Sequence, residues 1–397
     1  MYKLYCRAFQ RTFNAGSQIM PWRKPHKLNN YDELVKTLRD KRCKSAMLVT
    51  DKTIVTHNLH VDLLDKLTSA NIKVAVYDET VANPTVDNIE AALEIYKAEN
   101  CTAIIALGGG SVMDCAKGIG ARATRPRKSI RQMRGLFKVL LPLPTLIAIP
   151  TTSGSGSETT VAAVVTDGEE KFALIDLALI PHYVLMLPEL TMGLPPFFTV
   201  TTGMDALCHA VEAYIGRSNT EQTKADATNA VRLIFDNLPK AFNDGTDLTA
   251  RANMQEAAFL AGAAFTRVYV GNIHAISHTL SGMYDTPHGL ANAVIMPYVL
   301  EIYGKAISQP LFELACAVGL ANDKTPINVA AKRFIDALWE MNEKMGIPKK
   351  IDGIKRADIP LLAQRACKEA NPLYPVPVIF TKEDMMVVLL RVSGGAK

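Results

Sequence analysis

The segment Thr102–Ser111 reads TAIIALGGGS, and it decides the class of fold that we expect for the chain. It begins with a short, nearly continuous apolar run, which is typical of a strand buried on both faces of a sheet. Three glycines follow, and a helical pattern begins at Val112 and continues through Asp114 to Lys117. The segment therefore predicts a strand, a glycine turn and the start of a helix.

Such a turn suits a bound diphosphate. Glycine lets the backbone approach a ligand closely, and the first turn of a helix offers unpaired N–H groups and the positive end of the helix dipole. The spacing matches neither a Walker loop nor the G-x-G-x-x-G fingerprint, so a tight strand-to-helix turn without a ligand stays an alternative.

Strands and helices alternate through the first half of the chain. Three further apolar runs predict buried strands, at Ser45–Asp51, Lys73–Asp78 and Leu146–Pro150, and Val86–Glu99 has the apolar spacing of a helix. Asp167-Gly168, between two strand-like runs, is typical of a hairpin turn. Strands separated by helices predict right-handed βαβ units and a mostly parallel, Rossmann-like sheet.

The second half of the chain has a helical pattern and no confident strand. The helical patterns follow Pro195-Pro196, at Gly203–Ile215, Thr223–Asn237, Leu248–Phe265 and Val329–Met345. We therefore expect an α/β nucleotide-binding domain in residues 1–194 and an all-α domain in residues 195–397, with the boundary at the two prolines.

Composition and charge exclude several classes of protein. The chain has 397 residues, 48% of them hydrophobic and 21% charged, so it is neither disordered nor fibrous. No apolar run reaches the length of a membrane helix. The net charge of +5 is too small for a bulk nucleic-acid binder, although the acid-free basic segment Arg122–Arg134 leaves a nucleic-acid- or partner-binding protein with a structural metal as a remote alternative. The seven cysteines are expected to be thiols in the cytoplasm.

A second loop that could bind a ligand follows the strand at Leu146–Pro150. Pro150–Glu158 reads PTTSGSGSE, and its hydroxyl and amide groups suit phosphate or ribose oxygens. The alternative is a flexible polar loop with a helix cap. Because both loops follow strands of one sheet, we expect them to lie together at its carboxyl edge, where ligands of open α/β sheets bind.

Metal-binding residue types gather in the helical half. Asp205 and His209 are one helical turn apart on the same face, His274 and His278 repeat that spacing, and His288 follows a proline. Imidazole with one carboxylate suits Fe(II) or Zn(II) better than Ca(II) or Mg(II). The spacing alone leaves open which four of the five side chains bind an ion.

These motifs together resemble the iron-containing (group III) alcohol dehydrogenase family. The resemblance extends from about Ser45 to Asp384, and the segments that support it are Thr50-Asp51-Lys52, Asn83-Pro84-Thr85, GGGS with Asp114 and Lys117, PTTSGSGSE, Gly203–His209, and His274 through Pro287-His-Gly289. It implies a fold similar to dehydroquinate synthase, in which an α/β nucleotide-binding domain precedes a helical metal-binding domain.

The resemblance also implies roles for individual residues. It assigns the metal ligands to Asp205, His209, His274 and His288, and it puts His278 near the nicotinamide, where imidazole suits a catalytic proton relay. Its cofactor contacts fall on Asp51, Asn83, Gly109, Gly110, Ser111, Thr151, Thr152, Ser155 and Lys171. A carboxylate at Asp51 bonds a ribose 2′-hydroxyl and repels a 2′-phosphate, so NAD(H) is expected rather than NADP(H).

The implied activity is that of a metal-dependent, NAD(H)-linked alcohol dehydrogenase or aldehyde reductase. The ion would be Fe2+ or, alternatively, Zn2+. Small and aromatic residues between Phe259 and Tyr269 suit a short primary alcohol or aldehyde, and the alternative is that they pack one helix on another. A glycerol dehydrogenase or a maleylacetate reductase of the same fold stays the alternative, and a homodimer is the family expectation. The chain departs from the family at Leu187-Pro188, where relatives often have Asp-Pro, and in the basic, aromatic segment Arg7–Leu28.

Overall fold

The computed structural model describes residues 1–168 and 170–394, which form two compact units. One unit is Trp22–Gly193, and the other joins Met1–Pro21 to the chain from Leu194 onward. The chain passes from one unit to the other between Gly193 and Leu194, whereas the sequence analysis put the boundary between residues 194 and 195. Residues 1–21 differ from the prediction, which assigned them to the N-terminal domain.

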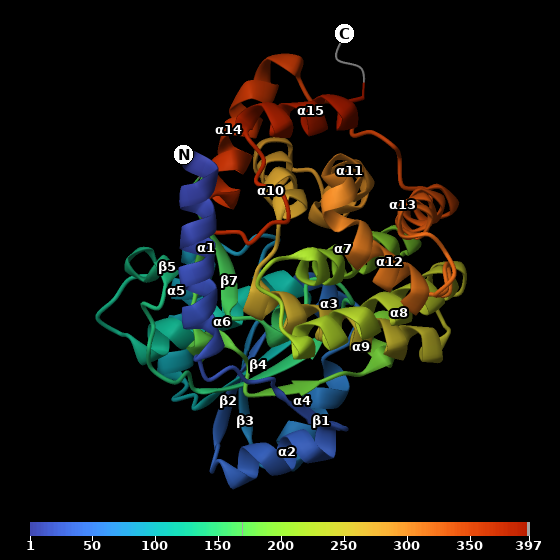
Figure 1. Cartoon of the computed structure of the whole chain (residues 1–397). Coiled ribbons are helices and arrows are strands. Elements are labelled where there is room, and N and C mark those ends of the chain that lie inside the picture. Colours follow the sequence, from blue (N-terminus) through green and yellow to red (C-terminus); the bar gives the residue numbers. More distant parts are fainter. Residues whose placement is uncertain (169, 395–397) are drawn as a thin grey trace. The chain divides into compact units, whose positions relative to one another are not determined.

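The reason for that difference is a first helix that the sequence did not reveal. Helix α1 (Tyr2–Gln18) buries Cys6, Gln10 and Ser17. Arg7 donates hydrogen bonds to the carbonyls of Val376 (2.6 Å) and Pro377 (2.7 Å), and Gln10 Nε2 donates to the carbonyl of Tyr374 (2.7 Å). Through these long-range hydrogen bonds, α1 is part of the helical unit (Figure 1).

The N-terminal unit is built on a six-stranded parallel sheet with the order β1-β9-β6-β4-β2-β3. All of the predicted strands of this sheet are confirmed, whereas β1 and β9 were not predicted because three residues give no clear apolar run. The strands are β1 (His26–Leu28), β2 (Ser45–Val49), β3 (Lys73–Tyr77), β4 (Ala103–Gly108), β6 (Thr145–Pro150) and β9 (Tyr183–Leu185).

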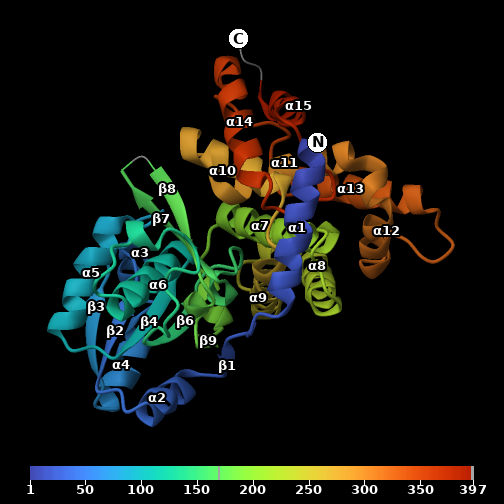
Figure 2. The same ribbon diagram turned by 60° about the vertical axis from the view of Figure 1, so that its left-hand side comes forward.

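Helices cover both faces of this sheet (Figure 2). Leu34 of α2 and Leu63 of α4 share a buried cluster with Leu48 and Ile105 of the strands. The chain moves across the sheet in one direction from β2 to β3 and in the other direction from β3 through β4 to β6. Because the crossovers are right-handed, α5 and α6 lie on the face opposite to α2 and α4. The helices are α2 (Tyr31–Asp40), α3 (Lys52–Thr56), α4 (Val61–Ser69), α5 (Val86–Ala98) and α6 (Gly110–Thr124).

A small second sheet consists of β5 (Gly135–Leu136), β7 (Ala162–Asp167) and β8 (Glu170–Ile175). Strands β7 and β8 are antiparallel, with Val164 opposite Ala173, which confirms the predicted hairpin.

The second unit is helical, as predicted. Helix α7 (Pro196–Ile215) is buried along almost its whole length, and it packs against α8 and α9. The other helices are α8 (Glu221–Asn243), α9 (Leu248–Val268), α10 (Asn272–Tyr284), α11 (His288–Tyr303), α12 (Ser308–Ala317), α13 (Ile327–Lys344), α14 (Ile359–Ala370) and α15 (Lys382–Val392).

Short 3-10 helices occur in both units. They lie at Arg131–Met133, Ser157–Thr159, Leu177–Leu179 and Pro188–Thr191 in the α/β unit, and at Gly304–Ile307 and Arg356–Asp358 in the helical unit.

Candidate cofactor loops and metal centre

The two loops predicted to bind a cofactor lie side by side at the carboxyl edge of the parallel sheet. Strands β4 and β6 are neighbours, with Gly108 opposite Pro150. A Cβ atom at Gly110 would lie 2.7 Å from Ser155 Oγ, and one at Gly109 would lie 3.5 Å from Thr152. Glycine at these positions therefore lets the start of α6 approach the hydroxyl-rich loop, which continues from Thr151.

A buried lysine ties these two loops together. Lys117 of α6 has no exposed surface. Its Nζ donates to Ser157 Oγ (3.0 Å), to the carbonyl (3.1 Å) and Oγ1 (2.9 Å) of Thr160, and to the carbonyl of Ala162 (2.7 Å). Burial lowers the pKa of Lys117 to about 8, although nearby carboxylates oppose this shift. On the other side of Ser157, Asp114 Oδ1 accepts a 2.7 Å hydrogen bond from its hydroxyl.

Three other predicted cofactor residues lie on neighbouring segments of the same unit. The backbone N–H of Asn83 donates to Ser111 Oγ (3.3 Å), so these two residues are adjacent. Lys171 of β8 is opposite Thr166 of β7, whose N–H donates to the carbonyl of Pro84 (2.9 Å), next to Asn83.

Asp51 lies two residues beyond the end of β2 and caps the helix α3. Its Oδ1 accepts hydrogen bonds from the backbone N–H groups of Thr53 (2.8 Å) and Ile54 (3.0 Å). The carboxylate is thereby fixed at the carboxyl end of a strand, which is the position where a ribose hydroxyl is bound in sheets of this kind.

The predicted metal ligands converge in the helical unit. Asp205 and His209 lie one turn apart on α7, and His274 lies on the first turn of α10. The ligand atoms of these three buried residues all lie within 4.8 Å of one another. His288, the first residue of α11, joins them, because its Nε2 is 3.4 Å from Asp205 Oδ1.

A glycine makes this approach of α11 to α7 possible. A Cβ atom at Gly289 would lie only 2.1 Å from the carbonyl oxygen of Thr201. Any larger residue would push the start of α11 away from α7, and His288 away from Asp205. The His288-Gly289 pair in the sequence is explained by this close packing.

Asn292 is a polar residue of the centre that sequence reasoning missed. Its Nδ2 lies 2.7 Å from Asp205 Oδ1 and 3.1 Å from the Nε2 atoms of both His274 and His288. Its Oδ1 is buried and, among the residues that the structure describes, has no hydrogen-bond partner. The signal was available, because Asn292 follows His288 by one helical turn.

The electrostatics of the centre fit a divalent cation. Burial alone would raise the pKa of Asp205, but the imidazoles of His209, His288 and His274 hold it well below its ordinary value. A buried carboxylate surrounded by imidazole nitrogens is a donor set for Fe(II) or Zn(II). Cys208 also lies near His274, but burial raises the pKa of its thiol to about 12. Cys208 is fully buried within the hydrophobic core of the helical unit, which supports a packing role for this side chain.

His278 has different partners from the other histidines of this group. Its Nδ1 lies 2.6 Å from Glu369 Oε1, which also accepts a 2.8 Å hydrogen bond from the Tyr374 hydroxyl. The side chain is 41% exposed, and its ring stacks on that of His288 at 5.1 Å between centroids. The structure therefore puts His278 beside the metal-type cluster, with one nitrogen already engaged by a carboxylate.

The basic segment Arg122–Arg134 has partners within its own unit. Arg122 bonds both carboxylate oxygens of Glu90, Arg131 pairs with Asp167, and Arg134 pairs with Glu170 at 2.5 Å. Three of its arginines thus form ion pairs that the sequence alone did not identify.

Among the described helices, none combines the length and apolar character that crossing a membrane requires.

Both units of the chain match models of one protein family. Residues 24–188 match the family model for iron-containing alcohol dehydrogenase, and residues 199–392 match the model for the C-terminal part of the Fe-containing alcohol dehydrogenase family. A 1,3-propanediol dehydrogenase of Citrobacter freundii is 38% identical over 334 residues, which cover 83% of this chain and 86% of the relative. Alcohol dehydrogenase 4 of Saccharomyces cerevisiae is 35% identical over 366 residues, covering 91% and 94%.

Solved structures give the same result. A crystal structure of a 1,3-propanediol oxidoreductase superposes with a TM-score of 0.90 at 33% identity, and the match covers 94% of this chain and 100% of that one. The family models and this solved structure thus match both units of the chain. The chain belongs to the iron-containing alcohol dehydrogenase family, and it is an oxidoreductase that acts on CH–OH donors.

Proposed function

We propose that the chain is an NAD(H)-linked, metal-dependent dehydrogenase that interconverts short primary alcohols and aldehydes. One observation carries the proposal: a buried carboxylate, Asp205, lies among the imidazoles of His209, His274 and His288. These four side chains would hold the ion, Fe2+ or alternatively Zn2+. Bound there, a divalent ion supplies Lewis-acid polarisation of the alcohol or carbonyl oxygen, and nicotinamide supplies the hydride chemistry.

In this proposal His278 moves the proton. The 2.6 Å contact between its Nδ1 and the carboxylate of Glu369 favours a proton on Nδ1, because a carboxylate is a hydrogen-bond acceptor. The Nε2 atom then has a free lone pair, which accepts the alcohol proton during oxidation and returns it during reduction. The partly exposed ring gives that proton a route to solvent.

The preference for NAD(H) rests on Asp51. Two backbone N–H groups hold its carboxylate at the end of β2, so it is positioned to accept a hydrogen bond from a ribose 2′-hydroxyl. Gly109, Gly110 and Ser111, together with Thr151, Thr152 and Ser155, would contact the diphosphate and ribose, and Asn83 and Lys171 lie on adjoining segments.

The preference for short substrates is supported by Phe265 and by the relatives. The Phe265 ring stacks on His209 with 4.0 Å between centroids, which puts an aromatic wall beside the metal-type cluster. The similar proteins include a 1,3-propanediol dehydrogenase, a methanol dehydrogenase and a lactaldehyde reductase, all named for short alcohols or aldehydes.

The proposal also includes the location and the oligomeric state of the protein. The seven free thiols favour a cytoplasmic location, and the family resemblance favours a homodimer.

The test is a substrate comparison by NADH oxidation. Butanal and propanal are expected to be reduced with a higher kcat/KM than dihydroxyacetone or maleylacetate, the ketone and acidic substrates of the alternative activities. A preference for dihydroxyacetone or maleylacetate would contradict the proposed substrate class.

The role of His278 is tested with His278→Ala. We expect this variant to lose about 10²–10⁴-fold in kcat and to change its pH profile, which is the usual contribution of a positioned acid–base group. His26→Ala, on the edge strand β1, is the control and is expected to match the wild type. Unchanged turnover and pH profile in His278→Ala would exclude the relay.

A further inference from the structure

Glu212 lies on the same face of α7 as two of the proposed metal ligands. It follows His209 by three residues and Asp205 by seven, and only 4% of it is exposed. A carboxylate buried to this extent is costly unless hydrogen bonds compensate it.

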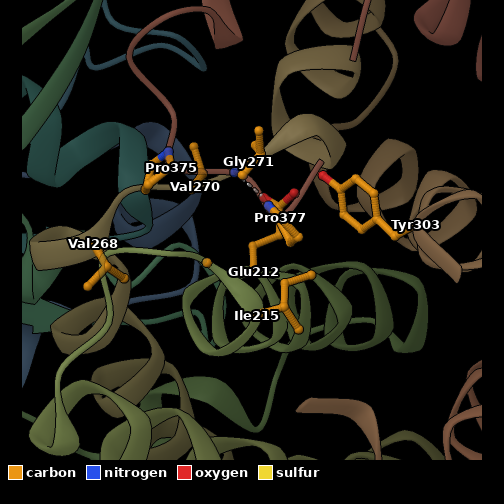
Figure 3. A pocket seen from close by; sticks show the side chains of 10 residues that line it. Glu212, Ile215, Val268, Val270, Gly271, Tyr303, Pro375 and Pro377 are labelled. Atoms are coloured by element: carbon orange, nitrogen blue, oxygen red, sulfur yellow. Dashed lines mark hydrogen bonds between the residues drawn. The ribbon is translucent and has the colours of Figure 1, made fainter. Parts of the chain in front are cut away.

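Three hydrogen bonds compensate this carboxylate. Oε2 accepts from the backbone N–H of Gly271 (2.6 Å) and lies 2.7 Å from His274 Nδ1, and Oε1 accepts from the backbone N–H of Ile273 (2.8 Å). Figure 3 shows Glu212 extending from its helix toward Gly271, with Tyr303 on the other side of the small pocket. The carboxylate thus also binds the N-terminal end of α10, where the helix dipole is positive.

These hydrogen bonds determine which ring nitrogen of His274 is available to an ion. Backbone N–H groups only donate, so both oxygens of Glu212 already act as acceptors. The Nδ1 atom of His274 must therefore carry a proton to bond Oε2. With Nδ1 engaged in this way, His274 can bind an ion only through Nε2, and it is this atom that lies 3.8 Å from Asp205 Oδ1.

The backbone around Glu212 is shaped to keep it in position. A Cβ atom at Gly271 would lie 2.6 Å from Glu212 Oε1 and 3.0 Å from its Cδ. The φ angle of Gly271 is −133°, which other residues also adopt. Glycine is thus needed at this position for the space that the carboxylate occupies and not for its backbone conformation.

We propose that Glu212 is a positioning residue that fixes the tautomer and the direction of His274, so that Nε2 is presented to the divalent ion. The inference rests on the proposed metal centre. Partners of this kind behind a metal-binding histidine typically contribute 10–100-fold to metal affinity.

Two variants test it in the whole protein. Glu212→Gln retains the size of the side chain but replaces one carboxylate oxygen by an NH2 group. This group then faces a hydrogen-bond donor, because both oxygens of Glu212 are surrounded by donors. Gly271→Ala displaces the carboxylate and leaves its charge unchanged. Glu369→Gln is the matched control, because Glu369 makes a similar 2.6 Å contact to His278, which is not one of the proposed ligands.

The first readout is the dissociation constant for Zn2+, measured by competition with a chelator. We expect it to rise 10–100-fold in Glu212→Gln and Gly271→Ala and to stay within twofold of wild type in Glu369→Gln. The second readout is the 15N NMR signature of His274 in the protein saturated with Zn2+, assigned with His274→Ala. The wild type is expected to show the tautomer protonated at Nδ1, and Glu212→Gln to lose it.

The outcomes separate this inference from the metal centre itself. Wild-type affinity and an unchanged tautomer in the variants would overturn the role of Glu212 and leave the metal centre intact. A wild-type chain that binds no divalent ion would overturn both. If Glu212→Gln does not fold, as circular dichroism would show, the Zn2+ affinity of Gly271→Ala decides.

Discussion

The ammonium group of Lys117, which has no exposed surface, lies 2.9 Å from Oγ1 of the buried Thr160. Lys117 belongs to the helix that begins at the glycine loop, and Thr160 ends the hydroxyl-rich segment that follows β6. One side chain therefore determines how the two loops of the α/β unit meet.

Lys117→Met is expected to loosen this junction. The variant keeps an unbranched side chain but removes the hydrogen bonds that the ammonium group donates to the carbonyls of Thr160 and Ala162, which costs about 1–3 kcal/mol of unfolding free energy. NADH affinity, measured by fluorescence titration, is expected to fall as well. Lys97→Met, which removes an exposed ion pair with Glu94, is the control and should change stability by less than about 0.5 kcal/mol. Wild-type stability and NADH affinity in Lys117→Met would show that the loops do not depend on it.

Asp51→Ser is expected to shift cofactor preference toward NADPH. Serine still caps α3, so the fold is retained, but the charge that repels a 2′-phosphate is gone. We expect the ratio of NADPH to NADH affinity to rise about tenfold or more, which corresponds to about 1.4 kcal/mol. The measurement is titration with both cofactors, with thermal unfolding as a check on the cap. An unchanged ratio would mean that Asp51 does not face the ribose.

His182 predicts how the stability of the α/β unit depends on pH. Burial, with smaller contributions from Arg23 and Lys41, lowers the pKa of His182 from 6.5 to about 4. Its Nδ1 accepts a 3.1 Å hydrogen bond from the N–H of Leu146, which requires the neutral ring. Only the unfolded chain takes up this proton between pH 6.5 and 4, so the contribution is complete above pH 6.5 and is lost as the pH falls.

The effect is smaller than the roughly 3 kcal/mol that the full shift would give, because solvent reaches part of the ring and screens its charge. His182→Asn keeps an acceptor for Leu146 but does not titrate in this range, so the loss between pH 6.5 and 4 should be larger in the wild type than in the variant. Urea unfolding at several pH values measures this difference. Parallel curves for the two proteins would refute the prediction.

The sequence predicted those parts of the fold that have a local signal. Apolar runs of five or six residues identified the central strands, such as β2 and β4, whereas β1 and β9 are too short to stand out. Helix α1 has no local feature that says which unit it joins. That is decided by Arg7 and Gln10, whose partners lie more than 360 residues away in the chain.

The same limit applies to the site. Spacing identified Asp205 and the histidines, but it left five candidates for four positions. The family resemblance assigned His288 rather than His278 to the metal, and in the folded chain His278 pairs with Glu369 whereas His288 Nε2 faces Asp205. Glu212 and Asn292 were missed, because a lone glutamate or asparagine on a helix has no distinctive pattern. Both lie at helical spacing from a predicted ligand, and that is the signal that would have found them.

The most direct test of the central claim is metal removal and restoration. The wild type is stripped of metal by a chelator, and NADH oxidation with butanal is measured after adding Fe2+ anaerobically or Zn2+. Activity should be lost on stripping and return with one of the ions, whereas His274→Ala should bind NADH but remain inactive with either. Full activity of the stripped wild type without any ion, or wild-type turnover by His274→Ala, would contradict the account.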